Sequence, residues 1–304
     1  MNKVFFTCIV LFTFLSCHSL VEDEFPDTKR IPVINGYLEQ GKTFKVHVTF
    51  STKVSDSIPP PVENAQVIIE STTKTPDTLK HTENGYYVSS RIVQIGETYT
   101  CKVHIAGYPT LLAQTTVPEQ TEVDSVYFTD LAQRGEEGEK ISSLEFFIAN
   151  NLLKKQYWHV LLISEGLKTY YDNEKDELVQ NYSIENETIY MLAGQDTTLL
   201  NEANPLTLFS NKLINKNSYK VKFYVNESYT RFYSDQTYYI ELRSVDEAYY
   251  KYLKQYYIYE SASFTEIGKS PQKYPLYSNV TNGLGIFYSY SSRKKKLIIN
   301  TANP

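Results

Sequence analysis

The stretch TFKVHVTF, residues 43–50, alternates apolar and polar side chains along its whole length. Successive side chains of a β-strand point to opposite faces, so this period of two predicts a strand with one buried face and one polar face. The buried face would carry Phe44, Val46, Val48 and Phe50. The polar face would carry Lys45, His47 and Thr49.

Short alternating runs of the same kind continue from residue 31 to residue 118. In residues 98–105 the inward positions are Tyr99, Cys101, Val103 and Ile105. Asn84-Gly85 is a turn signal before the next apolar run. About seven strands in roughly 90 residues are typical of an immunoglobulin-like β-sandwich. Because the chain has no Cys…Trp…Cys framework, the prediction for residues 31–118 concerns the architecture only.

A second β-rich domain is predicted for residues 123–304, after a polar hinge at residues 117–123. Alternating apolar residues favour strands at 142–149, 156–164, 219–225 and 237–243. The polar, acidic stretch 171–204 predicts either long loops or a hairpin insertion. A final short strand is expected at residues 296–300.

One helix is predicted near residues 245–260. Ser244 and Glu247 have the S-x-x-E spacing of a capping box, which satisfies the free N–H groups at the start of a helix. Apolar residues then recur every three or four positions, and this stripe is expected to pack against a sheet. Its members are Val245, Tyr249, Tyr252, Tyr256 and Tyr259. The predicted fold class is therefore all-β, an N-terminal immunoglobulin-like sandwich followed by a second β-rich domain with one capped helix.

Residues 1–16 have the layout of a secretory signal peptide. Lys3 precedes an apolar run that is shorter than the roughly 20 residues needed to span a bilayer. The run ends in Leu15-Ser16-Cys17, which is typical of cleavage by a lipoprotein signal peptidase, although Phe14 stands where leucine is commonest. An ordinary signal peptide is the alternative, but the A-x-A pattern that it favours is absent. We expect a lipid on Cys17 and a membrane tether over residues 17–30.

Glu22, Asp23 and Glu24 follow the expected lipidation site closely. Such an acidic cluster resembles the export signal that sends lipoproteins of Bacteroidota to the outer face of the outer membrane, and a solvated linker is the alternative. The formal net charge of −5 gives no electrostatic footprint for binding nucleic acid. The basic run 293–296 is more typical of a solvated strand edge than of a binding site.

The chain contains no H-E-x-x-H, G-x-S-x-G, C-x-x-C or phosphate-loop pattern. We therefore expect no catalytic residues, no metal and no cofactor. His47 and His104 both point off the inner face of their predicted strands, which allows either a surface metal pair or two solvated histidines. Cys101 lies on the core face, where a buried and inert thiol is expected.

Tyrosine is unusually frequent, with 27 of 304 residues, and suits half-buried pleated surfaces as well as wet interfaces. Tyr250 and Tyr257 lie off the apolar stripe of the predicted helix. They are the candidate surface for stacking on a sugar or on a partner protein, and packing beneath a loop is the alternative.

Five segments together carry a family resemblance: PVINGY (32–37), PVENAQV (61–67), DSVY (124–127), DEAYY (246–250) and YSNVTNGLGIF (277–287). Over nearly its whole mature length the chain resembles the Bacteroidota outer-membrane lipoprotein family registered as domain of unknown function 4249 (DUF4249). The segment YSNVTNGLGIF is the most specific part. Members of this family are usually encoded near TonB-dependent transporters and have no established activity, so the resemblance supplies no catalytic residues.

The resemblance implies a non-enzymatic lipoprotein, lipid-anchored in the outer membrane and facing the cell exterior. Its expected role is that of an accessory to a TonB-dependent transporter, either capturing a glycan or another nutrient or docking on the barrel. A free-standing binder of carbohydrate or another ligand is the first alternative. A hydrolase is the second, and it would need paired carboxylates in an exposed cleft.

Overall fold

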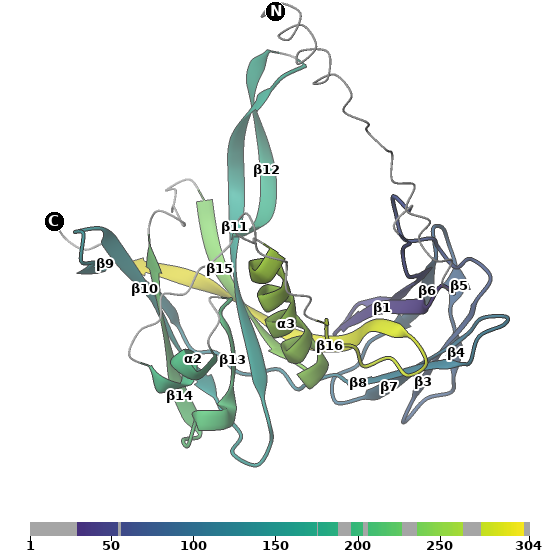
Figure 1. Cartoon of the computed structure of the whole chain (residues 1–304). Helices are drawn as coiled ribbons and strands as arrows, with labels where there is room; N and C mark the ends of the chain where they lie inside the picture. The colour runs from purple at the N-terminus through teal and green to yellow at the C-terminus, as the bar shows by residue number, and fades with distance from the viewer. Residues whose placement is uncertain are drawn as a thin grey trace, which may run out of the picture.

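The computed structural model describes residues 29–53, 56–174, 176–187, 196–202, 206–226, 236–263 and 275–300, and most of them lie in strands (Figure 1). The predicted all-β class is confirmed. The predicted signal peptide, Cys17 and the acidic triplet Glu22, Asp23 and Glu24 lie outside the described residues.

The N-terminal region is built from two sheets that enclose one core. Its strands are β1 (Pro32–Glu39), β2 (Thr43–Phe50), β3 (Gln66–Ser71), β4 (Asp77–Thr78), β5 (Lys80–His81), β6 (Tyr86–Ile92), β7 (Thr98–His104) and β8 (Leu111–Thr116). One sheet has the order β4-β3-β7-β8, and β1, β2, β6 and β5 belong to the other. The strand predicted from TFKVHVTF is confirmed, since its alternate residues Phe44, Val46 and Val48 are buried between the sheets.

Two local predictions in this region are also confirmed. Asn84 and Gly85 both have positive φ, 49° and 77°, as a two-residue hairpin turn of type I′ requires. Cys101 is fully buried in β7, and burial raises the pKa of its thiol to about 12. The thiol therefore stays protonated at neutral pH and is unreactive.

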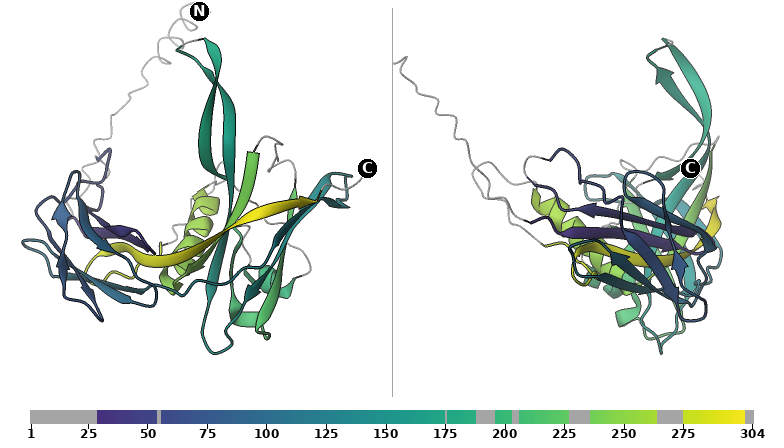
Figure 2. Two further views of the ribbon diagram at one scale, coloured as in Figure 1. Left: turned by 180° about the vertical axis from the view of Figure 1, so that it is seen from behind. Right: turned by 90° about the vertical axis from the view of Figure 1, so that its right-hand side faces the viewer.

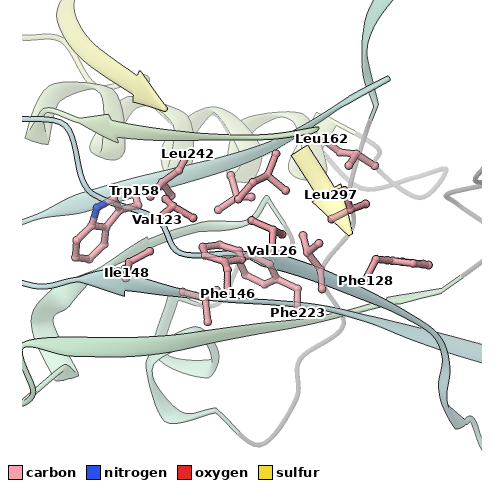
Figure 3. Close-up of a cluster of buried hydrophobic side chains, with 14 of the residues drawn as sticks. Val123, Val126, Phe128, Phe146, Ile148, Trp158, Leu162, Phe223, Leu242 and Leu297 are labelled. Atoms are coloured by element: carbon pink, nitrogen blue, oxygen red, sulfur yellow. The ribbon is translucent and has the colours of Figure 1, made fainter. Parts of the chain in front are cut away.

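The second region has the strands β9 (Val126–Arg134), β10 (Lys140–Ala149), β11 (Tyr157–Asp172), β12 (Glu177–Glu187), β13 (Leu208–Ser210), β14 (Ser218–Asn226), β15 (Gln236–Val245) and β16 (Leu284–Asn300). The helical elements are α2 (Thr197–Glu202), the 3-10 turn η1 (Asn211–Leu213) and α3 (Glu247–Ser263). Strand β10 pairs with β9 and β14, and β11 pairs with β15. Trp158 of β11 and Leu242 of β15 face Phe146 of β10 and Phe223 of β14 in one apolar core (Figure 3).

Strand β16 joins the two regions. Residues Leu284 to Tyr290 pair in parallel with β1, Tyr290 to Lys296 pair antiparallel with β15, and Leu297 to Asn300 pair in parallel with β9. Figure 2 shows this strand, in yellow, running from one region to the other. The sequence pattern predicts a loop and a strand over residues 275–290 and a separate final strand at 296–300, all within the second domain. The chain instead returns to complete the N-terminal sandwich, where Phe287 is fully buried.

Helix α3 is capped by a different residue from the one that the S-x-x-E spacing predicts. Oδ1 of Asp246 accepts the backbone N–H of Tyr249 at 2.7 Å, which is the geometry of an N-cap. Ser244 lies in β15, where its side chain bonds Thr121. The predicted capping box is therefore wrong, because Ser244 is held by the sheet before the helix begins.

The predicted apolar stripe of α3 packs only at its start. Tyr249 is 8% exposed and lies edge-on against Tyr288 and Tyr290 of β16, whereas Tyr259 is 45% exposed. The expectation that Tyr259 packs against the sheet is wrong. None of the helices among the described residues has the length and apolar character needed to cross a membrane.

Candidate functional site

A cleft of about 660 Å³ lies at the junction of the two regions and is the candidate functional site. One wall comes from the end of β8 and the hinge that follows it, and another from the loop before β11. The start of α3 and the segment around Tyr277 complete the site. The side chains that line it include Gln114, Thr116, Glu119, Lys154, Lys155, Gln156, Tyr157, Glu247, Tyr277 and Asn279. A cleft of this volume suits a small-molecule ligand, since such sites typically measure about 300 to 1,000 Å³.

The segment YSNVTNGLGIF forms part of the cleft and is held against β8 by hydrogen bonds. The side chain of Asn279 takes the place of a neighbouring strand: its Nδ2 donates to the backbone oxygen of Phe287 at 2.7 Å, and its Oδ1 accepts the Phe287 N–H at 2.9 Å. Thr281 forms a bridge with Leu112 of β8, and Nδ2 of Asn282 donates to the backbone oxygen of Thr110 at 2.9 Å. These contacts give the most specific part of the resemblance a structural role beside the cleft.

A buried polar cluster fixes the start of α3 relative to β8. The Asp246 carboxylate accepts hydrogen bonds from the Thr115 hydroxyl and from the Ser289 backbone N–H. Thr115 and Ser289 also bond each other at 2.6 Å. Burial raises the pKa of Asp246 to about 6 against the opposing effect of these hydrogen bonds. One carboxylate thus links β8, β16 and the first turn of the helix.

The exposed side chains of the cleft combine aromatic, amide and charged groups. Nζ of Lys154 lies 3.3 Å from a carboxylate oxygen of Glu119. The ring of Tyr157 packs on Tyr250 with centroids 4.6 Å apart, and burial together with the charge of Glu247 raises the pKa of Tyr157 to about 12. Tyr157 is therefore a neutral hydrogen-bonding group at physiological pH. The arrangement can stack a ring and hydrogen-bond a polar ligand.

Beside the cleft, His159 belongs to an aromatic cluster that sequence analysis did not identify. Its Nδ1 lies 2.8 Å from the Tyr249 hydroxyl. The Arg243 guanidinium carbon lies 4.6 Å from the ring centroid of Tyr290, which also packs on Tyr249. Burial and the nearby charge of Arg243 lower the pKa of His159 to about 3, although a hydrogen bond with the Leu206 backbone opposes this. Nothing local in the sequence around His159 signals this burial.

We expect His159 to make the protein less stable as the pH falls from 7 to 5. Its folded pKa of about 3 lies below the ordinary value of 6.5, so the unfolded chain binds a proton that the folded chain excludes. The contribution is present above pH 6.5 and decreases toward pH 3, with a loss of about 2 kcal/mol at pH 5. Urea unfolding of the native chain and of His159→Gln at several pH values measures it.

The comparison with His159→Gln separates the effect of His159 from that of Asp246, whose titration changes the stability with pH in the opposite direction. Asp246 has a raised folded pKa, so its ionisation removes stability as the pH rises from about 4 to about 6. That term is present in both proteins and cancels in their difference. If the stability difference between native chain and variant does not change with pH, the fold does not hold His159 neutral as its lowered pKa predicts.

The two tyrosines proposed as a partner surface are both half-buried on α3. The hydroxyl of Tyr250 donates a hydrogen bond to the carboxylate of Glu202, a residue that is 1% exposed. The same carboxylate accepts a hydrogen bond from Nζ of Lys254 at 2.9 Å. Burial raises the pKa of Glu202, but hydrogen bonds from Tyr250, Lys254 and Ser210 outweigh it and the net pKa is lowered. Tyr257 is half-buried farther along α3. Tyr250 therefore packs on Glu202 of α2 and on Tyr157 of β11, which lines the cleft.

The two strand histidines do not share a metal site. His47 of β2 stacks on Tyr86 with centroids 4.1 Å apart, while His104 of β7 has its Nδ1 3.0 Å from the Thr110 hydroxyl. The two strands belong to different sheets of the sandwich. Within the described parts of the chain, no group of three or more His, Cys, Asp or Glu residues is placed to hold a metal ion.

A protein-family model matches the chain. The family model described as a domain of unknown function (DUF4249) matches residues 19–296, which is nearly the whole chain. No curated protein matches it. The match spans both β regions and the cleft between them.

Proposed function

The chain belongs to the DUF4249 family, and for it we propose the role of a non-enzymatic outer-membrane lipoprotein that captures a ligand for a TonB-dependent transporter. In this role Cys17 carries the lipid anchor, and Glu22, Asp23 and Glu24 direct the protein to the outer surface. The described regions then stand outside the membrane, with the cleft open to the medium.

The cleft is the observation that supports this proposal. It is formed by segments distant in sequence, which β16 and the Asp246 cluster hold together. Its lining offers tyrosine rings, amides and both signs of charge, which suit reversible binding of a polar nutrient. A capture protein needs such a site, and a transporter needs the captured ligand delivered close to its barrel.

Affinity purification of the tagged full-length chain from its own membranes in mild detergent tests the role. We expect an outer-membrane barrel to co-purify and to be identified as a transporter by mass spectrometry. Recovery of the lipoprotein alone, in a detergent that preserves known barrel–lipoprotein complexes, would contradict the proposal.

The anchor has a matched control within the chain, because two cysteines lie near the N-terminus. Incorporation of a labelled fatty acid is expected to disappear in Cys17→Ser and to persist in Cys8→Ser. Labelling that survives Cys17→Ser would rule out Cys17 as the lipidated residue without affecting the barrel result.

A free-standing glycan binder is the second candidate. The half-buried Tyr157 and Tyr277 rings at the cleft, with Gln156 and Asn279 nearby, favour it, since sugars stack on aromatic faces and hydrogen-bond to amides. It predicts that the purified chain binds some member of a glycan array with no barrel present, and that Tyr157→Ala weakens that binding.

A further inference from the structure

The hairpin of β11 and β12 projects from the body of the protein as a two-stranded arm (Figures 1 and 2). Among the described residues, β15 pairs with β11 as far as Gly166, and β13 pairs with the first three residues of β11. Beyond Gly166 the described pairing is with β12 alone, as far as Asp172 opposite Glu177. We define the arm as residues 165–184.

One face of the arm carries five large exposed apolar side chains, with the polar residues Glu165, Thr169 and Gln180 among them. Leu167 lies opposite Tyr182 and Tyr171 lies opposite Leu178, and residues directly opposite each other in paired strands share a face. Every second residue of a strand also shares a face, so the two pairs and Ile184 lie on the same side. Their exposed fractions are 50% for Leu167, 61% for Tyr182, 52% for Tyr171, 71% for Leu178 and 60% for Ile184.

This arrangement is unfavourable for a strand pair left in water. A two-stranded hairpin is marginally stable unless a third strand or a packed face supports it. Large exposed apolar side chains gathered on one face, with polar residues among them, are typical of an interaction site. In addition, β12 is the last strand in the order of its sheet among the described residues.

The charges of the arm favour one kind of binding partner for this face over the others. The tip of the hairpin is acidic: residues 172–177 contain the four carboxylates of Asp172, Glu174, Asp176 and Glu177 against the single lysine at position 175, a formal charge of −4 + 1 = −3. On the opposite face, Nζ of Lys168 lies 2.6 Å from a carboxylate oxygen of Glu185. An anionic membrane surface would repel this tip, and a second copy of the chain would present the same acidic tip. A protein surface that is apolar and bordered by lysine or arginine complements both features.

We propose that the apolar face of the arm docks on a folded outer-membrane protein at an apolar strip bordered by basic side chains. The identity of that protein as the transporter barrel rests on the proposed function. The arm then holds the complex together, and the cleft remains free for ligand.

Site-specific photocrosslinking in the full-length tagged chain tests the arm. A benzophenone amino acid replaces Tyr182 on the apolar face or, as the matched control, its neighbour Asn181 on the opposite face. We expect the probe at position 182 to link to the barrel, with the crosslinked peptide carrying apolar residues next to lysine or arginine. The probe at position 181 should link poorly.

A second measurement uses variants that leave the body of the protein unchanged. Leu178→Ser combined with Tyr182→Ser is expected to lower the affinity for the barrel at least about tenfold, because the two changes remove the two most exposed apolar side chains of the face. Asn181→Ser should leave the affinity unchanged. Circular dichroism confirms that the variants remain folded.

The outcomes separate this inference from the proposed function. If the barrel co-purifies but the double variant binds normally and position 182 does not crosslink, the arm is not the docking surface although the function stands. If no barrel is recovered but position 182 links to another protein with the stated surface, the arm stands and the transporter role fails. Crosslinks from position 182 to lipid or to a second copy of the chain would overturn the arm proposal.

Discussion

Replacing Gly285 by alanine is expected to lower the free energy of unfolding by about 3 to 5 kcal/mol. Gly285 has φ of +106° and lies opposite Ile34 where β16 pairs with β1. A Cβ built there would lie 2.0 Å from the backbone oxygen of Ile34 and 2.8 Å from its carbonyl carbon. Backbone atoms in a paired strand cannot move aside as a flexible side chain can, so β1 and β16 must separate locally.

Gly41→Ala is the matched control, because Gly41 has a similar φ of +80° and nothing within 4 Å of the added Cβ. Its expected loss is about 1 kcal/mol, which reflects the left-handed backbone alone. Urea unfolding followed by circular dichroism measures both variants. Equal losses would show that backbone strain, and not the approach of β16 to β1, requires the glycine.

Period-two patterns within one strand were sufficient to predict much of the fold. The alternation at residues 43–50 and 98–105 follows from burial of one face, and the structure confirms the inward positions Phe44, Val46, Tyr99 and Val103. The same holds for residues 219–225, where Val221 and Phe223 are buried. Such a pattern is local, because each residue's environment repeats every second position.

Pairing between distant segments was not predictable from local patterns. Gly285 lies within β16, which pairs with β1 at the other end of the chain. No periodicity in either strand encodes the partner, since both are simply apolar on one face. The S-x-x-E spacing at Ser244 failed for a related reason, because Thr121 holds Ser244 in the sheet.

The cleft could be predicted only in part. Asn279 and Tyr277 belong to the segment that carries the family resemblance, but sequence alone did not reveal that Asn279 replaces a strand partner for Phe287. The residues before β11, from Lys154 to Tyr157, show no motif. They line the cleft because the next residue, Trp158, is buried in the core and fixes the start of β11.

That anchor gives the second large effect: Trp158→Ala is expected to destabilise the protein by about 3 to 5 kcal/mol. The indole has no exposed surface and packs on Phe209 with ring centroids 5.3 Å apart. Its Nε1–H donates to the Thr121 hydroxyl at 2.7 Å, and that hydroxyl also bonds Ser244 at 2.9 Å. Alanine would leave both a cavity and a hinge residue with one hydrogen bond fewer.

Two further variants separate packing from hydrogen bonding at this site. Trp158→Phe retains a ring in the core and removes the N–H donor, so its expected loss is about 1 to 2 kcal/mol. Thr121→Val keeps the shape and leaves the indole N–H without its acceptor, at a cost of about 1 to 3 kcal/mol. If the bond between them carries these losses, the double variant loses less stability than the two single losses added together. Strict additivity in chemical unfolding would instead mean that packing alone makes Trp158 the link between the hinge, the core and the loop beside the cleft.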